Sequence, residues 1–192
     1  YTPRALIKTI VKVVAPKIGQ SIYDGAVGSA GFLVEAFDYL NQPNLSTEET
    51  TILQKSTFYG KEKKSLAYII GIMNMILHGV EAPNIIHTNT LAETLTDIQE
   101  KDRFDITLAN PPFGGVVSNN NENNFPQTYR TKESADLFLI LMIHLLKKNG
   151  RAAIVLPDGS LTGDGVKQRI RQKLLEDCNL HTIIRLPNSV FQ

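Results

Sequence analysis

The stretch DITLANPPFGG ends an apolar run in an amide, Asn110, which is followed by two prolines and an aromatic ring. Proline lacks a backbone N–H and fixes φ, so Pro111 and Pro112 must end a strand and leave a stiff turn with unpaired carbonyl groups. Such a turn holds an amide oxygen and a carbonyl oxygen rigidly beside the ring of Phe113. The residue types and their order therefore indicate a site at a strand end.

Two rigid acceptors suit chemistry on an exocyclic amine of a base, which is a poor nucleophile because its lone pair is delocalised into the ring. If the Asn110 side chain and the Pro111 carbonyl both accept hydrogen bonds from that amine, the nitrogen is biased toward tetrahedral geometry. This stabilises the transition state more than the ground state. Phe113 would stack on the ring, a contact worth about 1–3 kcal/mol per base.

A second candidate site is the glycine-rich stretch IYDGAVGSAGFLVEA, in which a predicted strand ends at Asp24 and a helix follows. Glycines at this place let the backbone turn tightly and approach a ligand, and the helix start offers free N–H groups. The spacing of Gly25, Gly28 and Gly31 differs from the dinucleotide fingerprint Gly-x-Gly-x-x-Gly. A ligand-binding loop and a turn required only for packing both remain open.

The next two predicted strands each end near a polar side chain. Glu62 stands where a nucleoside-binding α/β fold places a carboxylate that accepts hydrogen bonds from both ribose hydroxyls. Asn89 stands where an amide can donate to and accept from an adenine edge. Singly, Glu62 could be a solvated acid among lysines and Asn89 a turn residue. Together with the glycine turn, the acid and the amide predict a nucleoside pocket.

Alternating strand and helix patterns position these residues. They predict an α/β fold with a doubly wound, mainly parallel sheet whose ligand lies at the carboxyl ends of the strands. The expected strands are Ser21–Asp24, Thr57–Gly60, Asn84–Thr88, Phe104–Ala109, Arg151–Leu156 and Leu180–Leu186. The expected helices are Arg4–Ala15, Ala30–Leu40, Lys63–Leu77, Ser134–Lys147 and Val166–Glu176. We expect Asn41–Glu49 to be a polar connection, and Val116–Lys132 to be a long Asn-rich loop that is either functional or disordered.

Composition excludes several classes of protein. The 192 residues are 42% hydrophobic, which suits one globular domain over 1–192. The longest apolar run, Leu137–Leu146, is interrupted by a histidine and is about half the ~20 residues that span a bilayer, so we expect a cytoplasmic protein without membrane contact. Cys178 is the only cysteine, which excludes an internal disulfide and favours a buried thiol. The four histidines lack metal-ligand spacing, so no metal site is predicted.

A family resemblance covers nearly the whole chain. In order, the stretches YTPR, DGAVGSAGFL, YGKE, NTL, NPPFG, ESADLFL, GRAAIVLPDGSL and IRQKLLEDCNLHTIIRLPNSVF resemble the modification subunit of type I restriction–modification systems. That family consists of site-specific adenine-N6 DNA methyltransferases, which use S-adenosylmethionine on a Rossmann-like fold. Two positions depart from its usual pattern, because Gly25 stands where the family has Pro and Asn89 where many members have Asp.

The resemblance also implies roles for individual residues. The catalytic residues would be Asn110, Pro111, Pro112 and Phe113. The S-adenosylmethionine-binding residues would be Tyr1, Thr2, Pro3, Arg4, Asp24, Gly25, Gly28, Ser29, Ala30, Gly31, Phe32, Glu62, Asn89 and Asn110. The implied partners are DNA, a specificity subunit that binds two modification subunits, and a restriction subunit.

Other functions remain open alongside this one. Related motifs occur in enzymes that methylate cytosine-N4, guanine-N2 or a protein glutamine, so a glutamine or other amino-group methyltransferase is the nearest alternative. A non-catalytic assembly subunit with the same fold and a nucleotide-dependent oxidoreductase are more distant ones. Because the sequence starts without Met and stops soon after a predicted strand, we expect a longer protein with an N-terminal helical region and a C-terminal part outside it.

Overall fold

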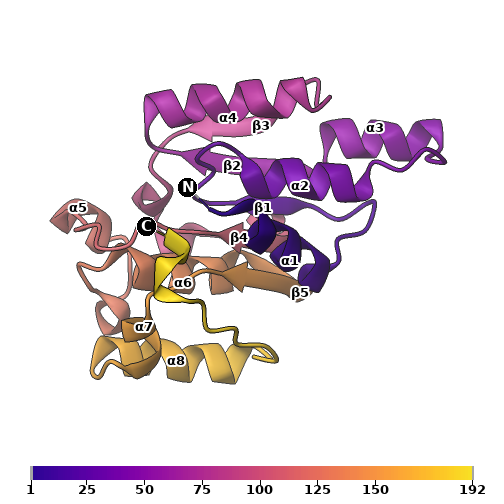
Figure 1. Cartoon of the computed structure of the whole chain (residues 1–192). Helices are drawn as coiled ribbons and strands as arrows, with labels where there is room; N and C mark the ends of the chain where they lie inside the picture. Colours follow the sequence, from indigo (N-terminus) through magenta and orange to yellow (C-terminus); the bar gives the residue numbers. More distant parts are fainter. Residues whose placement is uncertain (1, 192) are drawn as a thin grey trace. The chain divides into compact units, whose positions relative to one another are not determined.

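The structure, a computed structural model, describes residues 2–191, which divide between two compact units. Unit 1 holds the residues up to Thr90, together with Phe104–Ala109 and Leu146–Ala153. Unit 2 holds Leu91–Arg103, Asn110–Leu145 and the residues from Ile154 onward. The sheet lies almost entirely in unit 1 (Figure 1).

The sheet has five strands in the order β3-β2-β1-β4-β5. The strands are β1 (Ile22–Asp24), β2 (Phe58–Glu62), β3 (Asn84–His87), β4 (Phe104–Ala109) and β5 (Leu146–Ile154). The pairs β1–β2, β1–β4 and β2–β3 are parallel, and Asp24 at the end of β1 lies opposite Gly60 of β2 and Leu108 of β4. The predicted α/β class with a mainly parallel sheet is confirmed.

The helices follow the predicted periodicity in most places. Those of unit 1 are α1 (Arg4–Val14), α2 (Gly31–Leu40), α3 (Thr47–Lys55) and α4 (Ser65–Leu77). Those of unit 2 are α5 (Asn119–Glu122), α6 (Ser134–Leu145), α7 (Asp158–Thr162) and α8 (Val166–Asp177). Short 3-10 turns lie at Thr90–Ala92, Leu95–Asp97, Glu100–Asp102, Gln127–Tyr129 and Asn188–Phe191.

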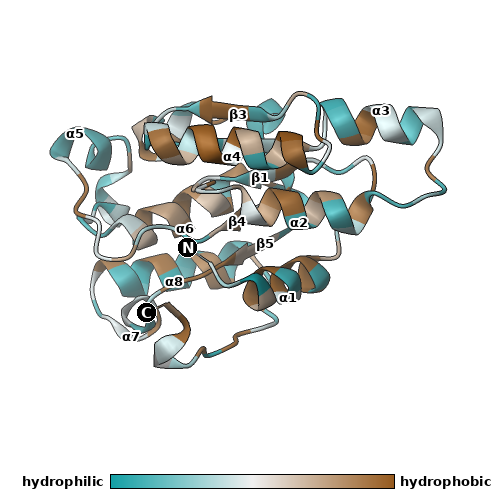
Figure 2. Cartoon of the chain, turned by 45° about the horizontal axis from the view of Figure 1, so that its top comes forward, coloured by the Kyte–Doolittle hydropathy of each residue, from teal (hydrophilic) through white to brown (hydrophobic). Residues whose placement is uncertain are grey.

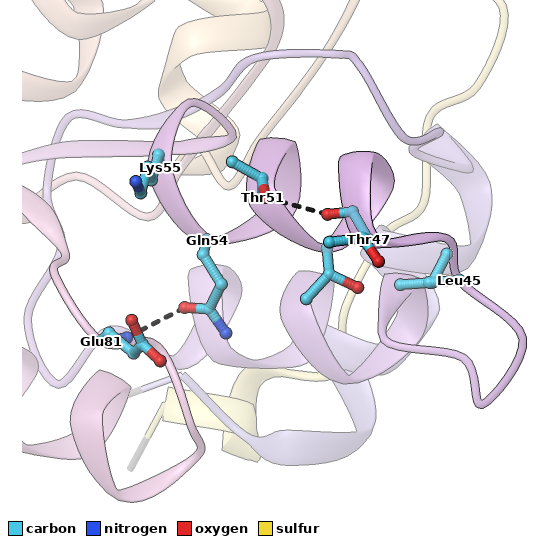
Figure 3. A pocket seen from close by; sticks show the side chains of 7 residues that line it. Leu45, Thr47, Thr51, Gln54, Lys55 and Glu81 are labelled. Carbon is cyan, nitrogen blue, oxygen red and sulfur yellow. Dashed lines mark hydrogen bonds between the residues drawn. The ribbon is translucent and has the colours of Figure 1, made fainter.

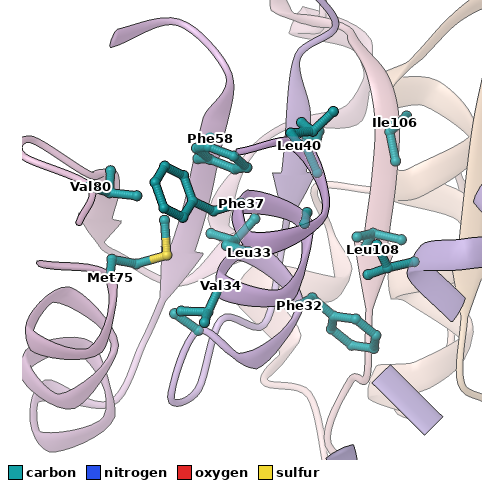
Figure 4. Close-up of a cluster of buried hydrophobic side chains, with 14 of the residues drawn as sticks. Phe32, Leu33, Val34, Phe37, Leu40, Phe58, Met75, Val80, Ile106 and Leu108 are labelled. Carbon is teal, nitrogen blue, oxygen red and sulfur yellow. The ribbon is translucent and has the colours of Figure 1, made fainter. Parts of the chain in front are cut away.

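The core of unit 1 forms where α1, α2 and α4 bury apolar side chains against the sheet. Figure 4 shows Phe37 of α2 between Phe58 of β2 and Met75 of α4, and the rings of Phe37 and Phe58 meet edge to face with centroids 5.9 Å apart. Ile106 and Leu108 of β4 extend the same cluster. This packing fixes the strands β1 and β2, whose carboxyl ends carry Asp24 and Glu62.

Three expectations about local structure are wrong. The strand expected at Arg151–Leu156 is β5, which begins at Leu146, within the helix that was expected to reach Lys147. The segment Leu180–Leu186 forms no strand, and Leu180, Ile183 and Ile184 are exposed in it. A strand requires backbone partners, and among the described residues this segment pairs with none. Asn41–Glu49 is not a connection throughout, because α3 begins at Thr47.

The start of α3 is explained by a capping box that is readable in the sequence. The Ser46 hydroxyl accepts from the Glu49 N–H, and the Glu49 carboxylate accepts from the Ser46 N–H at 2.8 Å. These bonds satisfy two donors that would otherwise lack partners at a helix start.

Other expectations from composition have mixed outcomes. The apolar run near Leu137 forms α6, whose side chains are mostly buried, and no helix in the described part of the chain is long and apolar enough to cross a membrane. Cys178 is a free thiol that is only partly buried. Across residues 2–191 no cluster of histidine, cysteine or acidic side chains has the geometry of a metal site.

Candidate active site

The loop between β1 and α2, residues 25–30, turns sharply at the carboxyl edge of the sheet. Gly28 has a φ of 55° and Ala30 a φ of 61°, both in the left-handed region that favours glycine. A Cβ at Gly28 would meet only the Ala26 carbonyl oxygen, at 3.9 Å, so the space beside Gly28 is open. A ligand can therefore approach the backbone at Gly28. Gly25 does not adopt a positive φ.

Besides the bond from the Val27 N–H to the Lys61 carbonyl at 3.2 Å, three side-chain hydrogen bonds from β2, α4 and the turn after β3 hold this loop. The Thr90 hydroxyl donates to the Gly25 carbonyl at 2.5 Å, and the Asn74 amide of α4 donates to the Ser29 carbonyl at 2.8 Å. The Gly28 N–H donates to the Glu62 carboxylate at 2.9 Å. The loop is thus tied to the ends of β2 and β3 and to α4, and the Thr90 bond supports the turn at Gly25.

Two glycines outside the loop make room for it, and neither was predicted to be a site residue. A Cβ at Gly60 of β2 would lie 2.3 Å from a methyl group of Val27 and 3.1 Å from the Asp24 carbonyl oxygen. A Cβ at Gly71 of α4 would lie 2.9 Å from the Gly28 carbonyl oxygen. The pattern of residues along a strand or helix does not indicate such roles, because both glycines contact a loop that is distant in the sequence.

Glu62, the last residue of β2, has backbone partners for both carboxylate oxygens. One oxygen accepts from the Gly28 N–H at 2.9 Å and the other from the Lys64 N–H at 2.8 Å. Each oxygen retains a further lone pair for a ligand hydroxyl. The structure therefore brings Gly28 and Glu62 together, as the nucleoside-pocket hypothesis requires.

Asp24 is almost wholly buried, with 1% of its surface exposed, although it is an acid. One carboxylate oxygen accepts from the Ala26 N–H at 2.9 Å, and the other is buried without a partner. Burial raises the pKa of Asp24 to about 7, the Ala26 hydrogen bond opposes this rise, and the nearby negative charge of Glu62 adds to it. An unpaired oxygen of this kind indicates a place for a donor or a cation.

The raised pKa of Asp24 predicts a pH dependence of stability. The folded pKa of about 7 lies above the usual 3.8, so this group favours folding below about pH 4 and loses that contribution as pH rises through 7. Relative to Asp24→Asn, the unfolding free energy of the ligand-free wild type should fall by about 2–3 kcal/mol between about pH 5 and pH 8. Urea denaturation at both pH values measures this difference.

Asp38→Asn is the matched control, because Asp38 is an exposed acid on α2. Its unfolding free energy should follow that of the wild type at both pH values. If wild type and Asp24→Asn showed the same pH dependence, Asp24 would not be held in its protonated form near neutral pH.

The remaining residues predicted to bind the cofactor have different places in the structure. Tyr1 lies outside the described residues. Pro3 precedes α1, which starts at Arg4 and packs on α2. A Cβ at Gly31 would lie 2.8 Å from the Ile7 side chain of α1, so Gly31 is explained by helix packing. The Phe32 side chain belongs to the core (Figure 4), which leaves only its backbone to face a ligand.

Asn89 and Thr2 complete this set. Asn89 follows β3 by two residues, next to Thr90, whose hydroxyl holds the glycine loop. Thr2 comes just before Pro3, the N-cap of α1. Thr90 itself was not predicted as a site residue, because the sequence does not show which group a threonine hydroxyl in a turn will contact.

The Asn110–Phe113 segment belongs to unit 2 and follows directly after Ala109, the last residue of β4. Pro111 is buried, whereas Phe113 keeps 41% of its surface exposed and meets Phe191 edge to face, with ring centroids 5.8 Å apart. Gly114 follows with a φ of 68°. The segment therefore presents an aromatic ring on a turn that is stiffened by two prolines.

The loop after this segment is closed at its base. The Ser134 N–H donates to the Gly115 carbonyl at 3.2 Å, and the Val117 N–H donates to the Lys132 carbonyl at 2.9 Å. Phe125 is buried near its centre, with 1% of its surface exposed. The Asn-rich stretch is thus an ordered loop that includes α5, not a disordered one.

A shallow hollow of about 330 Å³ elsewhere in unit 1 does not belong to this site (Figure 3). Gln54 of α3 lies beside it, donates to the Gly79 carbonyl at 2.8 Å and accepts from the Glu81 N–H at 3.0 Å. The hollow lies where α3 ends before β2 and where β3 is about to start, at the amino ends of these strands. It carries none of the predicted site residues.

The sequence model described as N-6 DNA Methylase matches residues 1–192. The chain belongs to this family. It is 48% identical over 192 residues to the methylase subunit of the type I restriction enzyme EcoEI from Escherichia coli, an alignment that covers 100% of the chain and 39% of that protein. The chain thus spans about two fifths of this relative's length.

Solved structures agree with this family membership. A modification subunit of a putative type I restriction enzyme from Vibrio vulnificus YJ016 has a TM-score of 0.86 and 42% identity, over 91% of this chain and 38% of that one. A putative class I S-adenosylmethionine-dependent methyltransferase from Listeria monocytogenes, at 18% identity, has a TM-score of 0.63 over 90% of this chain and 49% of its own. The second likeness concerns the fold alone. The resemblance to type I modification subunits is confirmed.

Proposed function

We propose that this N-6 DNA methylase chain is the catalytic domain, over 1–192, of a type I modification subunit and methylates adenine N6 from S-adenosylmethionine. The observation that carries the proposal is the orphaned oxygen of buried Asp24 beside a glycine loop that is held on Glu62. The Asn-Pro-Pro-Phe segment follows β4, the strand that pairs with β1. Family membership supports the same reading.

The donor and acceptor set in unit 1 fits this cofactor. The remaining lone pairs of Glu62 suit ribose hydroxyls, and the open space at Gly28 suits close approach of a ligand to the backbone. The orphaned Asp24 oxygen suits the positive charge of the methionine part, which favours the ionised form of the carboxyl. When bound, S-adenosylmethionine supplies an electrophilic methyl group.

The Asn110–Phe113 segment would act on the acceptor base. The Asn110 amide oxygen and the Pro111 carbonyl accept hydrogen bonds from the adenine amine and so direct its lone pair. Pro111 and Pro112 keep both acceptors in place without a conformational cost during the reaction. Phe113, whose ring is partly exposed, stacks on the base.

DNA and the other subunits of a type I system are the proposed partners. The base must leave the duplex to reach such a site, which costs a few kcal/mol of stacking and pairing. Recognition of a specific DNA sequence also requires a protein element in the major groove and contacts with the phosphates. The family resemblance assigns this task to a specificity subunit that binds two modification subunits, with a restriction subunit in the same system.

A product analysis tests the proposed function. The native polypeptide, together with its specificity subunit, is incubated with tritiated S-adenosylmethionine and unmethylated duplex, and the digested DNA is separated by chromatography. We expect the label in N6-methyladenine. Label in N4-methylcytosine or in glutamine of a protein substrate would identify a different amino-group methyltransferase, and no transfer to any of these would favour an assembly role.

A further inference from the structure

The outer face of α4 carries a row of apolar side chains in water. We call this row the α4 stripe, and Figure 2 shows the hydrophobic colour along the helix. Leu66 and Leu77 at its ends expose 72% and 81% of their surfaces. The full row is Leu66, Ile69, Ile70, Met73, Ile76 and Leu77. Exposed apolar surface that is continuous along a helix marks an interaction site.

The opposite face of α4 is already occupied. Met75 is fully buried in the core of unit 1, and Gly71 packs against the glycine loop. The helix sequence from Ser65 to Leu77 contains no charged residue. A helix that is apolar on all sides is typical of a buried position in a larger protein, not of a solvated surface.

The spacing of the α4 stripe fits a second helix. Leu66, Ile70, Met73 and Leu77 follow one another at intervals of four, three and four residues along α4. This is the alternation by which one helix packs its side chains into the grooves of another. The matching surface is an apolar row on an amphipathic helix, because a charged partner would lose its hydration there without a counter-charge.

The small size of the α4 stripe indicates how its partner is held. A helix of this length is about 20 Å long, and two packed helices lie about 10 Å apart. The surface that one helix buries on the α4 stripe is therefore smaller than the ~1,000 Å² that separate proteins need for stable association. A helix of the same polypeptide avoids this limit, because the connecting chain keeps its effective concentration at the α4 stripe at about 1 mM. The matched region is 39% of the EcoEI methylase subunit, so most of that polypeptide lies outside it.

From these observations we propose that the α4 stripe is covered by an apolar helix of the same polypeptide, from a part outside residues 1–192. The occupant is intramolecular, and neither a second copy of α4 nor another subunit takes its place. The inference concerns the assembly of the chain and is independent of the reaction that it catalyses.

Site-specific crosslinking on the native polypeptide, purified at its natural length, tests the proposal. A benzophenone amino acid is introduced in place of Met73, which exposes 57% of its surface, and after irradiation the crosslinked peptides are identified by mass spectrometry. We expect a crosslink within one polypeptide, at monomer mass, to an apolar segment outside these 192 residues. The same probe in place of Glu48, an exposed residue of α3, should give no such crosslink.

Other crosslinking results would overturn the proposal. A product at twice the monomer mass would identify a second copy, and a product with another subunit would identify an intersubunit contact. No crosslink at Met73 would show that the stripe remains in water. As a second measurement, Met73→Glu should lower the thermal midpoint of the native polypeptide by several degrees, whereas Thr51→Glu on α3 should leave it unchanged.

Discussion

Asn110→Ala in the native enzyme is expected to lower the rate of methyl transfer by at least about 10²–10³-fold, the usual cost of removing one group that stabilises developing charge. The affinity for S-adenosylmethionine should remain nearly unchanged, because the amide acts mainly when the acceptor nitrogen becomes tetrahedral. A tritiated-methyl assay under saturating DNA and cofactor measures the rate, and titration calorimetry measures the affinity.

Asn120→Ala is the matched control, since Asn120 is an exposed asparagine in the loop that follows the same segment. It should leave both the rate and the affinity at wild-type values. Wild-type turnover in Asn110→Ala would contradict the role of this amide in activating the amine. Equal losses of rate in both variants would instead point to a general disturbance of the loop.

Glu62→Ala is expected to weaken the binding of S-adenosylmethionine by about 1–3 kcal/mol, the value of a hydrogen bond to a charged group. The carboxylate is the proposed acceptor for the ribose, and it also holds the N–H groups of Gly28 and Lys64. Removing it should therefore take away a ligand contact and loosen the loop. Titration calorimetry on the native polypeptide measures the change in affinity.

Glu62→Gln separates these two contributions. Its side-chain oxygen can still accept from one backbone N–H, while its NH₂ group faces the other donor, so we expect an affinity between those of Glu62→Ala and wild type. Glu48→Ala, at an exposed acid of α3, should bind as wild type does. If Glu62→Ala bound the cofactor as tightly as wild type, Glu62 would not be part of the site.

Sequence patterns predicted those parts of the site whose residues follow strands directly. Asp24 and Glu62 each stand at the end of a strand, and parallel strands bring their carboxyl ends to one edge, while Asn110 follows β4 directly in the chain. This rule predicted that the glycine turn and Glu62 lie near one another, and the structure adds a hydrogen bond from the Gly28 N–H to the Glu62 carboxylate at 2.9 Å. The roles of the individual residues in binding and catalysis stay predictions.

Residues that act through distant partners were not predictable in this way. Gly60, Gly71 and Asn74 support the loop only because β2 and α4 pass close to it, and a single sequence does not report such approaches. The strand expected at Leu180–Leu186 shows the opposite error. Its composition favours a strand, but strand formation depends on a neighbour with free backbone groups.

The side-chain hydrogen bonds from β2, α4 and the turn after β3 make the glycine loop a pre-organised receptor. The Gly25 carbonyl, the Gly28 N–H and the Ser29 carbonyl are each held by a side chain from a different element of the protein itself. Ordering a loop on binding costs free energy that must be taken from the contacts made with the ligand. Because side chains of the protein itself hold these three groups, a small molecule that binds there retains most of the free energy of its contacts as affinity.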